Sequence, residues 1–263
     1  MSGRWQEWIV QKNKRENDSY KNLKILLGIL AISLPLVCII GGALSPWHEI
    51  QISISHTYHT NLRDVMVGLL ACVAIVFVSS IGYGVIDTIV TTVIGLAAAG
   101  VVLFPCPINP LSPANVAVAQ AVTTITGGDP GKVVQAASEI PVGIFLINQS
   151  AVGIPHLLCA GAFFILLAVN SICIFTVTTP ETWNPKKKLR NIIYIVCGCV
   201  ILACMALLLI VYLAAPDVVA HSYLGFICES IMLWAFGFAW LVKGGLIGFR
   251  NKKPARSVVS GGA

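Results

Sequence analysis

Residues 62–104 read LRDVMVGLLACVAIVFVSSIGYGVIDTIVTTVIGLAAAGVVLF, which is two long apolar blocks joined by a short connection containing glycine. A helix needs about 20 apolar residues to cross the hydrocarbon core of a bilayer, which is about 30 Å thick. The blocks 63–83 and 86–104 both reach this length. With only Gly84 and Val85 between them, they predict a tight antiparallel pair of membrane-spanning helices.

The rest of the chain has the same character. Hydrophobic residues make up 57% of the 263 positions and charged residues only 11%, whereas about 25% of the residues in a soluble domain are charged. Further apolar blocks lie at 25–44, 155–178, 192–214 and 222–247. The sequence therefore predicts an all-α, polytopic transmembrane bundle with six spans.

The positive charges predict the orientation of these spans, because Lys and Arg near helix ends stay on the cytoplasmic side. If the N-terminus is cytoplasmic, the basic residues on that side are Arg4, Lys12, Lys14, Arg15, Lys21, Lys24, Lys186, Lys187, Lys188, Arg190, Lys243, Arg250, Lys252, Lys253 and Arg256. Of the 17 basic residues, only Arg63 and Lys132 are left for the outer side. We therefore expect a multi-pass protein of the cell membrane with both termini in the cytoplasm.

Three regions follow from this topology. A basic cytoplasmic segment (1–24) precedes the membrane domain (25–247), and a basic cytoplasmic tail (248–263) follows it. Residues 1–24 lack the small-residue cleavage site of a secretory signal peptide, so we expect the first apolar block to remain in the mature protein. The long outer connection, 105–154, is rich in proline and glycine. It is either a lid or binding element, or a set of short segments resting on the outer bilayer face.

The net charge of +6 does not indicate a nucleic-acid partner. The basic residues flank apolar blocks and form no folded basic domain. The sequence predicts the lipid bilayer as a partner. It does not predict an oligomeric state.

A dense polar cluster lies at the outer mouth of the second block. Within QISISHTYHTNLRDVMVGLL (51–70) it comprises Ser53, Ser55, His56, Tyr58, His59, Arg63 and Asp64. Polar groups bordering lipid are costly unless they have partners. Two further unusual residues should lie at a similar depth: His156 at the start of the fourth span, and Glu229 about two turns into the sixth.

These residues define a candidate pocket at the outer ends of the second, fourth and sixth spans. Its candidate ligand-binding residues are Ser55, His59, Arg63, Asp64, His156 and Glu229. At 1.5 Å per residue, Glu229 should lie about 10 Å below the start of the sixth span. A long side chain such as that of Arg63 reaches this depth when it points inward, so we expect an ion pair between Arg63 and Glu229.

Three functions remain open. The pocket could bind a small ligand or a lipid head group. It could instead hold zinc on His59, His156 and Glu229 and act as a metal-dependent intramembrane lipid hydrolase, although the sequence contains neither HxxxH nor HExxH. The polar residues could also only tie helices together, with 105–154 docking a partner. The sequence thus leaves open whether the protein is an enzyme.

Four segments together resemble a group of bacterial six-helix membrane proteins of uncharacterised activity. They are SISHTYHTNLRDVMVGLLACVAIVFVSSIGYG, PHLLCAGAFFILLA, RNIIYIVCG and ESIMLWAFGFAWLVKG. The resemblance covers the second to sixth spans and implies a Ser-Ile-Ser segment (53–55), an Arg-Asp pair, a His opening the fourth span and a Glu in the sixth. It implies no activity.

Ser55 and His59 also resemble the Ser-xxx-His element of the membrane hydrolase superfamily of alkaline ceramidases and progestin-type receptors. That resemblance implies zinc-dependent hydrolysis of a lipid amide. The chain departs from the superfamily in having six expected spans instead of seven, in lacking a late HxxxH, and in placing Asp64 closer to His59 than the pattern requires.

Overall fold

The structure of the protein is a computed structural model consisting largely of long helices. The described residues are 3–45, 50–80, 84–107, 120–125, 127–129, 132, 141–142, 147–177 and 185–247.

The structure contains long helices and several short elements between them. The elements are α1 (Gly3–Leu44), η1 (Ser55–His59), α2 (Arg63–Val78), α3 (Val85–Leu103), β1 (Pro141–Val142), β2 (Ile147–Asn148), α6 (Gln149–Val169), η2 (Asn170–Ile174), α7 (Pro185–Ala214), α8 (Pro216–His221) and α9 (Leu224–Gly244). η1 is a 3-10 turn, and η2 is a π-helical turn that continues α6. β1 and β2 form a short antiparallel pair.

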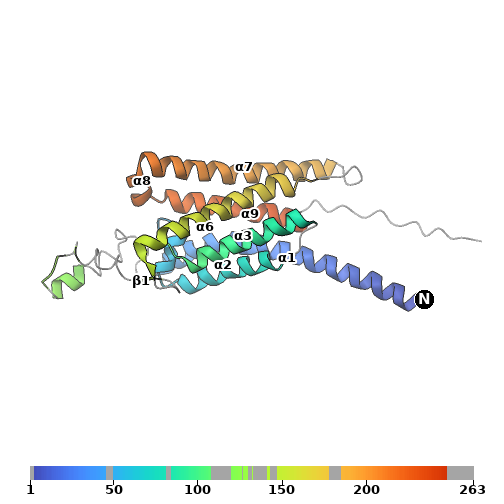
Figure 1. Cartoon of the computed structure of the whole chain (residues 1–263), viewed down its shortest axis with the longest axis horizontal. Helices are drawn as coiled ribbons and strands as arrows, with labels where there is room; N and C mark the ends of the chain where they lie inside the picture. Colours follow the sequence, from blue (N-terminus) through green and yellow to red (C-terminus); the bar gives the residue numbers. More distant parts are fainter. Residues whose placement is uncertain are drawn as a thin grey trace, which may run out of the picture.

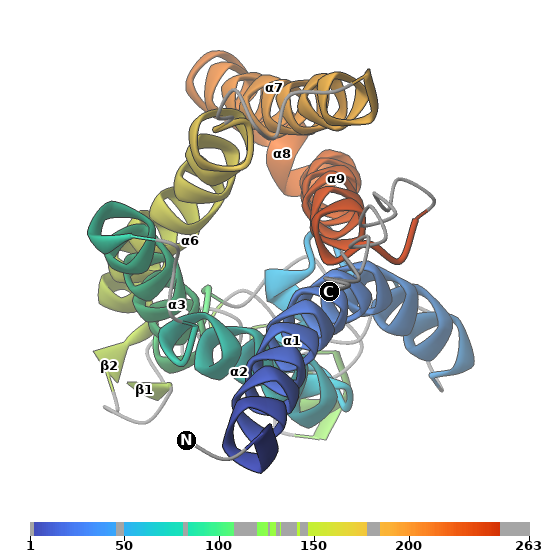
Figure 2. The same cartoon turned by 90° about the vertical axis from the view of Figure 1, so that its right-hand side faces the viewer.

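Six of the described helices form a closed ring. α1 packs against α2, α2 against α3, α3 against α6, α6 against α7 and α7 against α9, and α9 returns to α1. Figure 1 shows these helices running side by side along the long axis, and Figure 2 shows the ring from one end. Helices adjacent in sequence are thus neighbours in space, and the last helix closes on the first.

The predicted all-α bundle is confirmed. Five described helices are long and apolar enough to cross a membrane: Asp18–Leu44, Val85–Leu103, Gly153–Ile174, Pro185–Ala214 and Leu224–Gly244. They match five of the six predicted blocks. The remaining block corresponds to α2, which has 16 residues and is therefore about 24 Å long at 1.5 Å per residue.

Several helix boundaries differ from the prediction. α6 begins at Gln149 and contains Pro155, which was expected to open the helix; a proline removes one intrahelical hydrogen bond, and membrane helices tolerate this. α7 begins at Pro185, seven residues earlier than expected, because proline suits the first helical position. α2 ends at Val78, five residues earlier than expected.

The regions outside the membrane domain are only partly described. Residues 3–24 continue directly into α1 as one helix, which extends past its neighbours in Figure 1. The tail 248–263 and most of the connection 105–154 lie outside the described residues. The lid interpretation of 105–154 therefore stays a prediction.

α9 is the most enclosed of the five candidate spans. In its apolar window 61% of the residues are buried, against 22% to 33% in the other four. It meets α1 at a pair of glycines: a Cβ on Gly28 would lie 2.8 Å from the carbonyl oxygen of Gly237, and a Cβ on Gly237 would lie 2.8 Å from that of Gly28. Small residues permit this backbone contact, which fixes the position of α9, and with it Glu229, in the ring.

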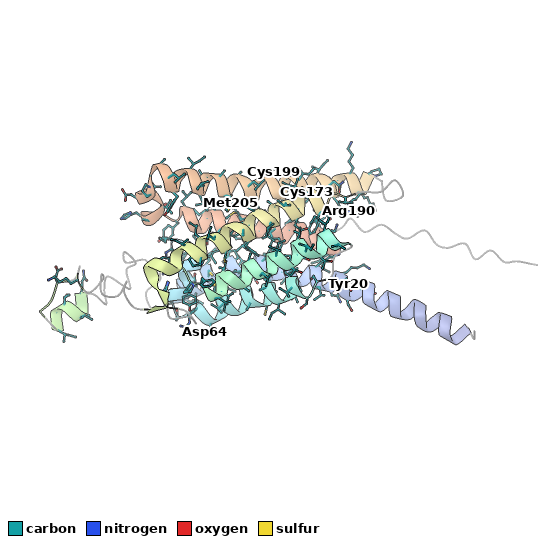
Figure 3. All side chains as sticks on the ribbon, in the orientation of Figure 1. Tyr20, Asp64, Cys173, Arg190, Cys199 and Met205 are labelled. Atoms are coloured by element: carbon teal, nitrogen blue, oxygen red, sulfur yellow. The ribbon has the colours of Figure 1, made fainter. Side chains whose placement is uncertain are left out.

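The two ends of the bundle can be told apart by the residues that lie there. Figure 3 places Asp64, in the first turn of α2, and Arg190, near the start of α7, at opposite ends. The starts of α2, α6 and α9 meet the end of α3 around one cavity. We call the end of the bundle that holds this cavity the site end.

Candidate functional site

The segment 50–59 at the site end folds back into the bundle instead of running over its surface. Ile54 and Thr57 are buried, at 5% and 2% exposure. A local turn shapes the segment, because the Ser53 hydroxyl oxygen accepts a hydrogen bond from the backbone N–H of His56 (3.2 Å) and lies 2.6 Å from His56 Nδ1. A Ser three residues before the amide that it caps is a common way to begin a helical turn.

The first turns of α9 hold this segment in place. The backbone N–H of Phe226 donates to the Ile52 carbonyl oxygen at 2.7 Å. The contact needs glycine at the preceding position, since a Cβ on Gly225 would lie 2.8 Å from that same oxygen. Segment 50–59 and α9 therefore meet backbone to backbone.

Glu229 makes the second attachment. Its Oε2 accepts a hydrogen bond from the backbone N–H of Ile54 at 2.7 Å, and the backbone N–H of Ser55 also donates to this carboxyl group. These two amides stand at the N-terminus of η1, where the N–H groups have no partner within the turn and where a negative charge is favoured. Glu229 is thus a cap for η1 supplied from 175 positions away.

The predicted ion pair between Arg63 and Glu229 is wrong. Arg63 Nε instead pairs with Asp64 Oδ1 at 3.1 Å, and the two side chains are 55% and 87% exposed. The Arg63 guanidinium also lies 5.8 Å from the centre of the Tyr58 ring. Both charged residues sit at the N-terminus of α2 and point away from the cavity, because the main chain of segment 50–59 already occupies the place next to Glu229.

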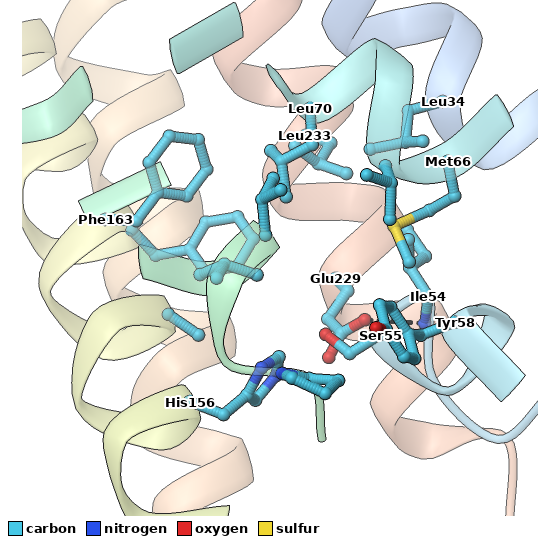
Figure 4. Close-up of a pocket in the computed structure, with 16 residues that line it drawn as sticks. Leu34, Ile54, Ser55, Tyr58, Met66, Leu70, His156, Phe163, Glu229 and Leu233 are labelled. Carbon is cyan, nitrogen blue, oxygen red and sulfur yellow. Dashed lines mark hydrogen bonds between the residues drawn. The ribbon is translucent and has the colours of Figure 1, made fainter. Parts of the chain in front are cut away.

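A cavity lies between the helices beside this segment. Its walls come from α1, segment 50–59, α2, α3, α6 and α9. Its volume is about 40 Å³, enough for a few water molecules. Most of the lining is apolar, with Leu34, Met66, Leu70, Phe163 and Leu233 among the residues that Figure 4 labels.

The polar lining gathers at one end of the cavity. Ser55, Tyr58, His156 and Glu229 all line it. In Figure 4 Glu229 approaches from α9 and His156 from α6, and Ser55 and Tyr58 lie beside Glu229. Of the six predicted pocket residues, the structure brings together Ser55, His156 and Glu229.

The hydrogen bond of His156 defines its tautomer. Nδ1 lies 2.7 Å from the carbonyl oxygen of Phe104. A carbonyl can only accept, so Nδ1 carries the hydrogen and neutral His156 presents an unprotonated Nε2. The ring is 9% exposed and lines the cavity. His156 therefore offers the cavity a hydrogen-bond acceptor.

His59 makes the equivalent contact outside the cavity. Its Nε2 lies 2.7 Å from the carbonyl oxygen of Cys106. The carbonyl groups of Phe104 and Cys106 need side-chain donors. They lie just past the end of α3, where helix carbonyls lack backbone partners, and the prolines at 105 and 107 have no N–H group to donate. His59 is thus a structural tie between segment 50–59 and the end of α3.

Burial keeps the two histidines of segment 50–59 neutral. It lowers the pKa of His59, and the hydrogen bond to Cys106 opposes that shift. Burial also lowers the pKa of His56 to about 4, with smaller contributions from charge on His59 and His156. Neither imidazole brings a positive charge to the site end at neutral pH.

The predicted zinc ligands do not form a metal site in the part of the chain that is described. Within those residues, no three His, Cys, Asp or Glu side chains lie close enough to hold a metal ion. His59 and His156 each direct one protonated ring nitrogen to a carbonyl oxygen, so only the other nitrogen of each ring could be a ligand. Zinc binding therefore finds no donor set here.

Sequence reasoning overlooked two features of the site. Tyr58 was placed in the polar cluster but not in the pocket, which it lines. The main-chain partners of Glu229, His59 and His156 were also overlooked. The sequence Phe-Pro-Cys-Pro (104–107) was the available signal for them, because prolines leave neighbouring carbonyl groups in need of donors.

Comparison with protein-family models, with curated proteins and with solved structures finds no match to this chain. The class that composition and fold define is a helical bundle with several helices of membrane-spanning length and apolarity.

Proposed function

We propose that the protein is a six-span protein of the cell membrane with both termini in the cytoplasm, and that its cavity binds a small ligand or a lipid head group. The site end is then the outer end of the bundle.

The charge distribution supports this topology. Of the 17 Lys and Arg residues, all but Arg63 and Lys132 fall on the cytoplasmic side of a six-span arrangement that starts inside. α2, at about 24 Å, spans most of the hydrocarbon core, and segment 50–59 before it enters the bundle as backbone outside the α-helices, with a 3-10 turn at 55–59. Such backbone is tolerated at membrane depth where protein surrounds it.

The observation that carries the binding function is the position of Glu229. A carboxyl group within a membrane helix is costly, and such residues mark ligand or ion sites by default. Glu229 has two backbone amides as partners, and no ion pair with a Lys or Arg is found for it among the described residues. Glu229 lines a cavity that is also lined by His156, Ser55 and Tyr58.

A purely structural role is the second candidate, and a specific observation favours it. Each ionisable residue of the predicted site has a partner inside the protein: Glu229 holds Ile54, His156 holds Phe104, and Arg63 pairs with Asp64. The first two contacts tie α9 to segment 50–59 and α6 to the end of α3 without any ligand, whereas Arg63 and Asp64 are neighbours within α2. The two candidates differ in whether the cavity accepts a molecule.

The hydrolase candidate has less support. It needs a metal-activated water and three converging ligands, and the described residues contain no such group.

Photolabelling tests the binding function directly. The full-length protein in phosphatidylcholine nanodiscs is irradiated with octanol bearing a diazirine, and labelled peptides are mapped by mass spectrometry. We expect labels at the cavity-lining parts of α6 and α9. Ala160→Phe fills the cavity from α6 and should abolish those labels.

Ala206→Phe is the matched control, because Ala206 is exposed on α7 and outside the cavity. It should label like the wild type. Labelling of α6 and α9 that is equal in Ala160→Phe and the wild type would overturn the binding function and favour the structural role.

A further inference from the structure

Two polar side chains of the cavity can act only as hydrogen-bond acceptors when Glu229 is ionised and His156 is neutral. Glu229 is the first. The N–H groups of Ile54 and Ser55 stabilise its carboxylate as dipoles but carry no net charge. In a low-dielectric interior the attraction between opposite charges is strong, so an ionised Glu229 favours a cation in the cavity over any neutral group.

His156 is the second acceptor. Because Phe104 takes the hydrogen on Nδ1 at 2.7 Å, Nε2 can only accept as long as the ring is neutral. No hydrogen bond to Nε2 is found among the described residues. A group that enters the polar end of the cavity must therefore offer hydrogens to two acceptors at once.

The other lining residues restrict the head group of a ligand little, but they require the part beyond the head group to be apolar. The hydroxyls of Ser55 and Tyr58 can donate or accept, so they accommodate either kind of head group. Beyond them the walls are apolar, with Leu70, Phe163 and Leu233 facing the space. Such a surface suits the carbons next to the head group, whose burial is favourable. The rest of an eight-carbon chain would extend out of the cavity, which has room for only a few water-sized groups.

We propose that the cavity selects a small amphiphile with a protonated amine head group, because Glu229 and His156, whose Nε2 is the ring nitrogen not bonded to Phe104, line the same end of a cavity that is otherwise mostly apolar. This inference rests on the binding function proposed above. An ammonium group has three donors and no acceptor, and so matches both acceptors and the charge.

The alternatives fit less well. An alcohol has a single hydrogen to donate and leaves the Glu229 charge without a counter-charge. A carboxylate or phosphate head group adds a second negative charge next to Glu229, and like charges in such a site repel strongly. The expected order of affinity is amine, then alcohol, then acid.

Competition against the diazirine octanol tests this order. Octylamine, octanol and octanoate share the same chain length, so their head groups are the only difference. Because an amine concentrates differently in a bilayer from an acid, the three are compared at equal bilayer-bound concentration, measured by partition into empty nanodiscs. We expect octylamine to compete at concentrations about tenfold lower than octanol, as a charge-assisted hydrogen bond predicts, and octanoate to compete least.

Two conservative variants show which residues set the preference. Glu229→Gln keeps an oxygen acceptor for the amide of Ile54 and removes the charge, so octylamine should lose its advantage over octanol. His156→Asn keeps an N–H near the position of Nδ1, and therefore the bond to Phe104, while removing Nε2. It should weaken octylamine more than octanol.

The outcomes separate this inference from the function on which it rests. Labelling that Ala160→Phe abolishes, but with octanol or octanoate competing as well as octylamine, overturns the amine preference and leaves ligand binding standing. Labelling that Ala160→Phe does not change overturns both. The order of the three competitors on the wild-type protein decides the proposal even if a variant fails to fold.

Discussion

Replacing Gly225 with alanine should disconnect segment 50–59 from α9. The added Cβ would lie 2.8 Å from the Ile52 carbonyl oxygen, a backbone atom that cannot move without the segment. The displacement breaks the bond from Phe226 to Ile52 and stretches the one from Ile54 to Glu229, each 2.7 Å long.

The expected loss follows from these two bonds. A neutral hydrogen bond contributes about 1 kcal/mol to stability, and one to a charged group about 1.5 to 3 kcal/mol. Alanine returns at most about 1 kcal/mol through its helix propensity. The free energy of unfolding should therefore fall by about 1.5 to 3 kcal/mol, which lowers Tm by at least about 3 °C for a chain of this size.

Differential scanning fluorimetry of the protein in detergent measures this shift, and Gly68→Ala is the matched control. Gly68 lies within α2, and a Cβ there would meet no atom within 4 Å, so its Tm should stay unchanged or rise. Gly225→Ala should also lose photolabelling of the cavity. A Tm for Gly225→Ala equal to that of Gly68→Ala would refute the attachment of segment 50–59 to α9.

Three further predictions concern other parts of the molecule. Folding lowers the pKa of His56 from 6.5 to about 4, so the unfolded state binds more protons than the folded state between these pH values. The free energy of unfolding should therefore fall as the pH drops from about 6.5 to about 4. His56→Asn should weaken this pH dependence in a series of thermal melts. Gly237→Ala places a Cβ 2.8 Å from a backbone oxygen of α1 and should cost about 1 to 3 kcal/mol by overpacking, whereas Gly161→Ala, with no atom within 4 Å, should leave the detergent melting curve unchanged. Alkaline phosphatase fused after Asp129 should be active, and the same enzyme fused within the basic segment 186–190 inactive; the reverse pattern would contradict the proposed orientation.

The helical architecture could be predicted because many residues together determine it. Long apolar blocks must bond their own backbone groups in lipid, and helices do so without partners. Single residues decide where a helix ends, and there the prediction was less accurate. Pro155 was read as a helix start and lies within α6, while Pro185 was read as part of a connection and opens α7.

The candidate site was predictable in part. Ser55, His156 and Glu229 do line one cavity, because polar residues at equal depth on adjoining helices tend to face the interior together. Arg63 was expected there as well, on the basis of depth alone. Depth does not determine the direction of a side chain, and Arg63 turns outward to Asp64.

The partners of Glu229 could not have been predicted by matching side chains. They are main-chain amides of Ile54 and Ser55, and every residue except proline has such an amide. Only the folding of segment 50–59 into the bundle makes these two available. The same holds for the carbonyls of Phe104 and Cys106 that bond His156 and His59.

The cap that Glu229 provides also orders the events of biosynthesis. Chains are made from the N-terminus, so segment 50–59 is made before α9, whose Glu229 lies 175 positions after Ile54. Until α9 arrives, the amides of Ile54 and Ser55 have to bond to water or to the polar region of the lipids. The cavity therefore cannot form during the insertion of the earlier helices, and it is completed only when the last helix closes the ring against the first.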